Sequence, residues 1–198
     1  LVPPGSYSVT LDREVHGELT KLAGPETFEV VPLNLATLPA PDRKAAMAFL
    51  ENVQRLRRAV SGALKSGEEA QARIRHLRQA IVDTPGADPA LFADLQRVQD
   101  ELNDVLLALR GDPAKTKRNV FQPPSISDRV ERIANSQWTS TSAPTKTQRQ
   151  AYRWAGEAFT RELDRLRRTF DDLQALENRL EDAGAPWTPG RLPRWQME

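Results

Sequence analysis

The residues of this chain that could do chemistry are two histidines and a large set of carboxylates. His16 and His76 lie far apart in the sequence, and each lacks a second metal ligand three or four positions away. Cysteine is absent, which removes thiol nucleophiles and disulfides. No phosphate-binding glycine loop, GxSxG nucleophile elbow or HExxH zinc motif occurs. The sequence therefore predicts no catalytic residue, no metal site and no cofactor, and hence no enzyme.

The carboxylates are concentrated in the last third of the chain, where arginines accompany them. Glu162 and Arg165 are three residues apart, a spacing that suits an ion pair on a helix surface. Asp171 and Asp172 are adjacent, but neighbours on a helix point about 100° apart and do not share a proton. Glycosidases need two carboxylates that face each other across a cleft. The pattern thus favours solvation and ion pairing over acid–base catalysis.

Arginines are concentrated in a second long segment. Residues 42–83 hold nine Lys or Arg against five Asp or Glu, whereas residues 1–40 hold two against five. A basic helix face can bind phosphate groups, but no aromatic residues alternate with these arginines, and the net charge of the whole chain is only +1. We interpret this face as solvated or salt-bridged and predict no nucleic-acid partner. The candidate interaction surface comprises Arg55, Arg58, Arg73, Trp187 and Trp195.

The elements that must position these residues are long amphipathic helices. Thr145 and Gln148 have the spacing of a capping box, and Gly184 with Pro186 supplies a C-terminal stop. Between them, apolar residues recur at steps of three and four: Phe159, Leu163, Leu166, Phe170, Leu173, Leu176 and Leu180. The predicted helix is roughly 55 Å long. Its apolar stripe requires a partner of similar length.

That partner is predicted over residues 42–83, with Asp42 as its N-cap. The apolar register runs through Ser66 and Gly67 without a slip, as the following residues show: Phe49, Val53, Leu56, Val60, Ala63, Gly67, Ala70, Ile74, Leu77 and Ile81. This predicts one continuous helix, with a waist of small residues that lets a neighbouring helix approach closely. The alternative is two helices with a break near Gly67.

Two shorter helices are predicted between the long ones, over residues 88–110 and 126–138, with a loop at 112–124. Placed in tandem they match the length of the long helices. The predicted fold is mainly α: an elongated antiparallel helical bundle of three to four helices, two of them very long, with a short N-terminal β segment. A conventional four-helix bundle is the alternative.

The two ends of the chain differ from the predicted bundle over residues 42–184. Residues 1–32 alternate like strands, at 6–11, 18–22 and 27–31, and we interpret them as the terminal strands of a truncated sandwich module. The alternative is a small β cap on the helices. Residues 33–41 are predicted to be a linker. Residues 185–198 form a tail rich in proline and tryptophan, which we expect to pack on the bundle because exposed tryptophan is unfavourable.

Three stretches resemble one known group of proteins. VPPGSYSVTL with LAGPETFEVVPLN resembles the last strands of the immunoglobulin-like module in bacterial BNR-repeat, sortilin-like β-propeller proteins, which are often labelled glycosyl hydrolases. The segment that begins FLENVQRLRRAV resembles the long helix that follows it there, and the segment from SAPTKTQRQAYRW resembles the C-terminal helix. The resemblance implies a propeller on the N-terminal side that holds any active surface, and a secreted or periplasmic location. It does not extend to the tryptophan-rich tail.

Two functional hypotheses follow. The first is a non-catalytic C-terminal scaffold or interaction domain of a larger propeller protein, whose partner is the N-terminal propeller of the same polypeptide or another protein. The second is an independent helical adaptor that binds a partner helix or an acidic ligand. A homodimer is also considered, because a long helix pair with an open seam can self-associate. No apolar run reaches the length of a membrane span, so no membrane partner is predicted.

Overall fold

The computed structural model describes residues 2–33, 40–138, 140–190 and 197. Over these residues the chain forms a two-stranded antiparallel sheet followed by five helices, so the predicted mainly α class with an N-terminal β segment is confirmed. The elements are β1 (Gly5–Val15), β2 (Glu18–Val30), α1 (Arg43–Val82), α2 (Ala90–Arg110), α3 (Pro113–Lys117), α4 (Ile126–Trp138) and α5 (Lys146–Asp182).

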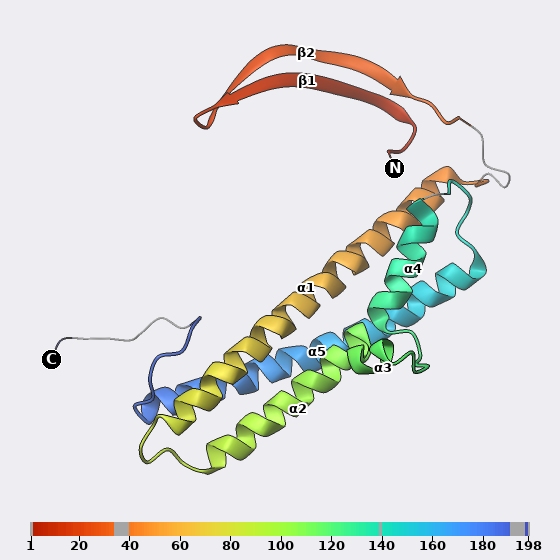
Figure 1. Ribbon diagram of the computed structural model, residues 1–198. Helices are drawn as coiled ribbons and strands as arrows, with labels where there is room; N and C mark the ends of the chain where they lie inside the picture. Colours follow the sequence, from red (N-terminus) through yellow and green to blue (C-terminus); the bar gives the residue numbers. More distant parts are fainter. Residues whose placement is uncertain (1, 34–39, 139, 191–196, 198) are drawn as a thin grey trace.

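The helices form an elongated bundle in which α1 and α5 run in the same direction. Helices α2 and α4 run against both of them and follow one another along the bundle (Figure 1). The larger apolar core joins α1, α2 and α5. A smaller core of Phe49, Val53, Ile133 and Ala134 joins α1 to α4, with Tyr152 of α5 packed against it. The bundle is therefore three helices thick. Two of the three positions are held by α1 and α5, and the third is shared by the shorter helices α2 and α4.

Side-chain caps determine where the helices begin. Asp42 accepts a hydrogen bond from the backbone N–H of Ala45 at 2.9 Å, as the predicted N-cap of α1 should. At α5, Thr145 and Gln148 form the predicted capping box, in which each side chain accepts from the other residue's backbone N–H. The hydroxyl of Ser125 caps α4. These short-range signals explain why the helix starts could be read from the sequence.

Helix α1 continues through Ser66 and Gly67, as the unbroken register predicted. Gly67 is buried, and a Cβ built on it would lie 2.7 Å from Cδ2 of Leu106 and 3.7 Å from Cδ1 of Leu102. Both leucines belong to α2 and are fully buried. Because Gly67 has no side chain, α2 can occupy the space beside it at the point where α2 crosses α1.

Two local expectations were wrong. Residues 18–22 and 27–31 are not separate strands, because β2 continues through the cis Gly24–Pro25 bond with only an irregularity of register. Part of the expected loop at 112–124 is the one-turn helix α3, which begins because Asp112 accepts hydrogen bonds from the N–H groups of Ala114 and Lys115. The capping aspartate followed by Pro113 was a signal for this turn.

The β1–β2 ribbon stands apart from the bundle (Figure 1), and within the described residues no helix contacts either strand. Tyr7 stacks on Phe28 with ring centroids 6.0 Å apart. On the same face, Val9 and Leu11 are 54% and 59% exposed. The opposite face carries Ser6 and other polar residues. The face of Tyr7 and Phe28 is mainly apolar, although Glu26, which pairs with Val9, also lies on it, and nothing in the described structure covers this apolar face.

The two chain segments that flank the bundle are only partly described. Most of the predicted linker, residues 34–39, lies outside the described residues. In the tail, Trp187 and Thr188 line a cavity of about 210 Å³ together with Leu77 of α1 and Leu180 of α5. The described start of the tail therefore lies near the end of the bundle, with Trp187 still 43% exposed.

Candidate functional site

An open groove of about 980 Å³ lies on the bundle between α2 and α5. It is lined by five carboxylates and two arginines: Asp100, Glu101, Asp104, Asp171, Asp172, Arg97 and Arg168. Helices α2 and α5 both bury their leucines in the shared core. The face of each helix beside its buried leucines carries these polar residues, and the two polar faces are turned toward each other.

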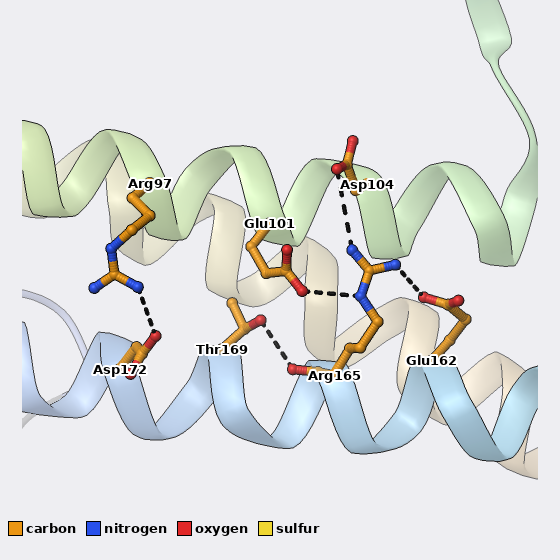
Figure 2. Close-up of polar contacts among 7 residues, drawn as sticks. All are labelled: Arg97, Glu101, Asp104, Glu162, Arg165, Thr169 and Asp172. Carbon is orange, nitrogen blue, oxygen red and sulfur yellow. Dashed lines mark hydrogen bonds and ion pairs between the residues drawn. The ribbon is translucent and has the colours of Figure 1, made fainter.

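Arg165 is the centre of a polar network that links α5 to two acids of this groove, Glu101 and Asp104 (Figure 2). Its Nε donates to Oε1 of Glu101 at 2.9 Å, and its Nη1 donates to Oε2 of Glu162 at 2.9 Å. Its Nη2 lies 4.0 Å from a carboxylate oxygen of Asp104. The predicted Glu162–Arg165 pair is present, and the same arginine links α5 to two acids of α2.

A second ion pair and a buried hydroxyl complete the network (Figure 2). Arg97 of α2 and Asp172 of α5 approach within 3.2 Å, both well exposed. Between these pairs, Thr169 is buried and its hydroxyl donates to the backbone carbonyl of Arg165 at 3.0 Å. Asp172 is therefore engaged by an arginine of α2, which does not suit an acid pair with Asp171.

The arginine at the centre also sets the ionisation of its partner. The hydrogen bond from Arg165 is the main cause that lowers the pKa of Glu101, and the positive charge of Arg165 adds to it. Conversely, the hydrogen bond to Glu101 raises the pKa of the Arg165 guanidinium. A carboxylate held ionised in this way accepts hydrogen bonds and is unsuited to donate a proton near neutral pH.

The lowered pKa of Glu101 predicts a pH dependence of stability. Because the pKa is lower in the folded chain, the stabilisation is complete above the ordinary value of 4.5 and is lost as the pH falls below it. We expect the free energy of unfolding to fall more steeply below that pH in the wild type than in Glu101→Gln. Urea unfolding across this range measures the difference, and identical slopes would contradict the assignment.

The proposed interaction residues do not form one surface. Arg55 and Arg58 are exposed on one side of α1, where Arg55 donates to Asn52. Trp187 lies near Ala80, at the other end of α1. Residues 55 and 80 are separated by roughly 38 Å along the helix. Trp195 lies outside the described residues.

Arg73 has a different environment from the one expected of a surface residue. Its guanidinium donates to both carboxylate oxygens of Glu177, at 2.7 Å each from Nη2 and at 3.0 Å from Nε. Its side chain is only 25% exposed, and Glu177 is fully buried. Arg73 is therefore a contact inside the bundle. The signal for it was the position of Glu177, four residues after Leu173 and three before Leu180 on the apolar stripe.

Sequence reasoning also missed an aromatic contact on the outer face of α4 and α5. The guanidinium of Arg129 lies 4.5 Å from the ring centroid of Trp154, which is 59% exposed. Trp138, at the end of α4, is 68% exposed. Neither tryptophan belongs to a local motif, because an exposed aromatic residue is recognised only once the packing of its helix is known.

The two histidines lie on separate elements, His16 in the turn of the ribbon and His76 on the exposed side of α1. Within the described ranges, no group of three or more His, Cys, Asp and Glu residues is placed to hold a metal ion. In the part of the chain that the structure describes, none of the helices combines the length and apolar character of a membrane span.

Comparisons with protein-family models, with curated proteins and with solved structures found no match to this chain.

Proposed function

We propose that this chain is a non-catalytic scaffold and interaction domain that docks through the apolar face of its β ribbon. The observation that carries the proposal is the exposure of Val9, Leu11 and Phe28 on a ribbon that contacts no helix within the described residues. A two-stranded ribbon is at best marginally stable alone in water, and needs a third strand or a packed surface. The apolar face is therefore the part of the molecule that requires a partner.

The resemblance to propeller proteins described above indicates which partner would cover this face. In this proposal the ribbon completes an immunoglobulin-like module of a larger, secreted or periplasmic propeller protein, and its apolar face packs on the second sheet of that module. The polar face of the ribbon, with Ser6 and Ser8, suits the solvent side of such a sandwich. The elongated bundle, with its two long helices, then serves as a spacer that extends from the module.

The chemistry of the bundle supports a non-catalytic role. Three carboxylates of the α2–α5 groove, those of Glu101, Asp104 and Asp172, pair with arginines, and Glu101 is held in its ionised form. The two histidines lie on separate elements and both are exposed. Nucleophilic catalysis requires an activated hydroxyl or thiol beside a base. The core residues of the larger cluster are aliphatic and aromatic, which favours a structural interior.

The docking proposal predicts a change in amide hydrogen exchange. The test compares this chain, at concentrations where it is monomeric, with the polypeptide extended by the upstream reading frame. We expect the amides of Gly5–Val30 to exchange rapidly in the first and slowly in the second, because docking buries the apolar face. Phe28→Ser should abolish the protection, whereas Thr27→Ser, on the opposite face, should preserve it.

Two outcomes would contradict this proposal. Equal exchange of the ribbon in both polypeptides would show that the extended chain does not cover it. An upstream frame that encodes neither strands nor propeller repeats would remove the proposed partner altogether.

A second candidate function, an adaptor for a partner helix or an acidic ligand, is favoured by the outer face of α4 and α5. Exposed tryptophan and arginine are enriched at protein interfaces, and here Arg129 stacks on Trp154. A partner with an acidic residue beside an apolar one would suit this pair. Trp154→Ala should weaken such binding without affecting the protection of the ribbon, which distinguishes the two functions.

A further inference from the structure

The β ribbon has a second unsatisfied feature besides its apolar face. In a two-stranded sheet each strand keeps one free edge, along which alternate N–H and C=O groups point outward without a strand to receive them. No third strand pairs with either edge among the described residues. Free edges are templates for pairing with another chain unless the sequence protects them.

The two edges differ in this protection. The outer strand segment Gly5–Leu11 of β1 contains no charged residue and no proline, and it alternates hydroxyl-bearing with apolar residues. Strand β2 carries Glu18, Lys21 and Glu26 and contains Pro25, whereas the register irregularities are common to both strands. Charge and proline are devices that discourage strand addition. The edge of β1 is therefore the one open to a further strand.

The sequence of this edge is complementary to itself. If two copies pair in antiparallel fashion about Ser8, then Tyr7 lies opposite the partner's Val9. In the same register Ser6 faces the partner's Thr10, and Gly5 faces the partner's Leu11. Apolar residues thus meet apolar residues on one face, and hydroxyls meet hydroxyls on the other. Aromatic with β-branched pairs and hydroxyl pairs are both stabilising across strands.

No charge opposes this pairing within the segment. The first charged residue, Asp12, would lie opposite the partner's Pro4, so that like charges do not meet directly. Each copy presents the same segment to the other, so every residue pair occurs twice. The interface therefore has twofold symmetry and is closed, with two copies only. The result would be a four-stranded sheet, which exceeds the size at which a sheet with an apolar face becomes stable.

We propose that a second copy of this chain occupies the free edge of β1, through antiparallel pairing of Gly5–Leu11 about Ser8. The inference rests on the proposed role of the ribbon as the docking element. It concerns the edge of the ribbon, however, and leaves the apolar face free for the module described above. An experiment can therefore contradict one of these two proposals without contradicting the other.

The absence of cysteine from the sequence makes a direct test possible. Ser8→Cys introduces a single thiol at the twofold axis, where opposed Cα atoms lie about 4.5–5.5 Å apart. That separation falls within the range for a disulfide. The matched control is Ser6→Cys, on the same face of the same strand. In the proposed register the two thiols of this control belong to positions four residues apart, about 13 Å along the strand, which is too far to bridge.

Under mild oxidation we expect Ser8→Cys to form a covalent dimer of twice the chain mass, and Ser6→Cys to stay a monomer. Light scattering of the wild type, at increasing concentration, should show the mass rising toward that of the dimer. Equal cross-linking of both variants would overturn the register. A wild type that remains a monomer at all concentrations, with no cross-linked Ser8→Cys, would overturn the dimer. Protection of the ribbon in the extended polypeptide would still support the docking proposal in that case.

Discussion

Replacing Arg73 by alanine is expected to reduce the free energy of unfolding by about 3–5 kcal/mol. Arg73 crosses from α1 to α5 and donates three hydrogen bonds to the carboxylate of Glu177, whose side chain is fully buried. The substitution removes the cation but leaves the carboxylate among the leucines of the core. A buried charge that loses its counter-ion is far more costly than the pair was favourable.

The control for this substitution is an exposed ion pair of the same bundle. Arg97→Ala removes the partner of Asp172, but the two side chains are 64% and 49% exposed, so water replaces the lost contact. We expect a loss of no more than about 1 kcal/mol. Urea unfolding monitored by the helical signal measures both variants. Equal losses would show that the burial of Glu177 does not determine the cost.

A double substitution separates the cost of losing the Arg73 contact from the value of the ion pair. Replacing both Arg73 and Glu177 by leucine removes the charges together, and buried ion pairs replaced by apolar residues of similar volume are often neutral or stabilising. The double variant is therefore expected to be more stable than Arg73→Ala. A double variant as unstable as the single one would indicate that the packing of the arginine side chain, whose guanidinium lies 6.0 Å from the ring centroid of Phe170, matters more than the ion pair.

The same pair shows what could not be predicted from the sequence. The apolar stripe of α5 was correctly predicted, but the acids of this segment were predicted only as a group to be solvated or ion-paired, although the spacing of Glu177 places it on the stripe. A charged residue on an apolar face can be buried only if another helix supplies a counter-ion. That counter-ion, Arg73, is 104 positions away. Periodicity describes one helix at a time, so it cannot reveal which residues meet across an interface.

Features that depend on residues close together in the sequence were predicted better than contacts between helices. The capping box of α5, the N-cap of α1 and the continuous register through Gly67 each involve residues within one or two helical turns. By contrast, Arg165 could be paired with Glu162 from spacing alone, but not with Glu101 on another helix. The sequence thus predicted the contact of this network within α5, but not its contacts between α5 and α2. The ribbon follows the same rule: its alternation was visible, but the continuous pairing of β2 across Gly24 and Pro25 was not.

The helix crossing at Gly67 leads to the other large effect. Replacing Gly67 by leucine is expected to destabilise the bundle by about 2 kcal/mol. Overpacking a well-filled core costs about 1–3 kcal/mol, and the higher helix propensity of leucine offsets less than 1 kcal/mol of it. Even the first atom of the new side chain would lie 2.7 Å from Leu106, whose own side chain is enclosed in the core. Helix α2 would have to move away from α1.

The same helix offers a matched control, because α1 contains a second interior glycine. Gly62 is exposed, and a Cβ built on it meets no atom within 4 Å. Gly62→Leu should therefore raise the free energy of unfolding by up to about 0.8 kcal/mol through helix propensity alone. The two variants share their chemistry and their helix, so opposite signs in urea unfolding would isolate the effect of the close approach.

A compensating substitution tests whether Leu106 is the residue that meets the added bulk. Leu106→Ala alone should destabilise by about 2–5 kcal/mol, because it leaves a cavity in the core. Combined with Gly67→Leu, the new side chain can fill that cavity, and volume-conserving exchanges usually cost less than about 1.5 kcal/mol. The double variant is thus expected to be more stable than the sum of the two single losses predicts. Simple additivity would mean that the two positions do not share the same space, and that the crossing of α1 and α2 is not held by this contact.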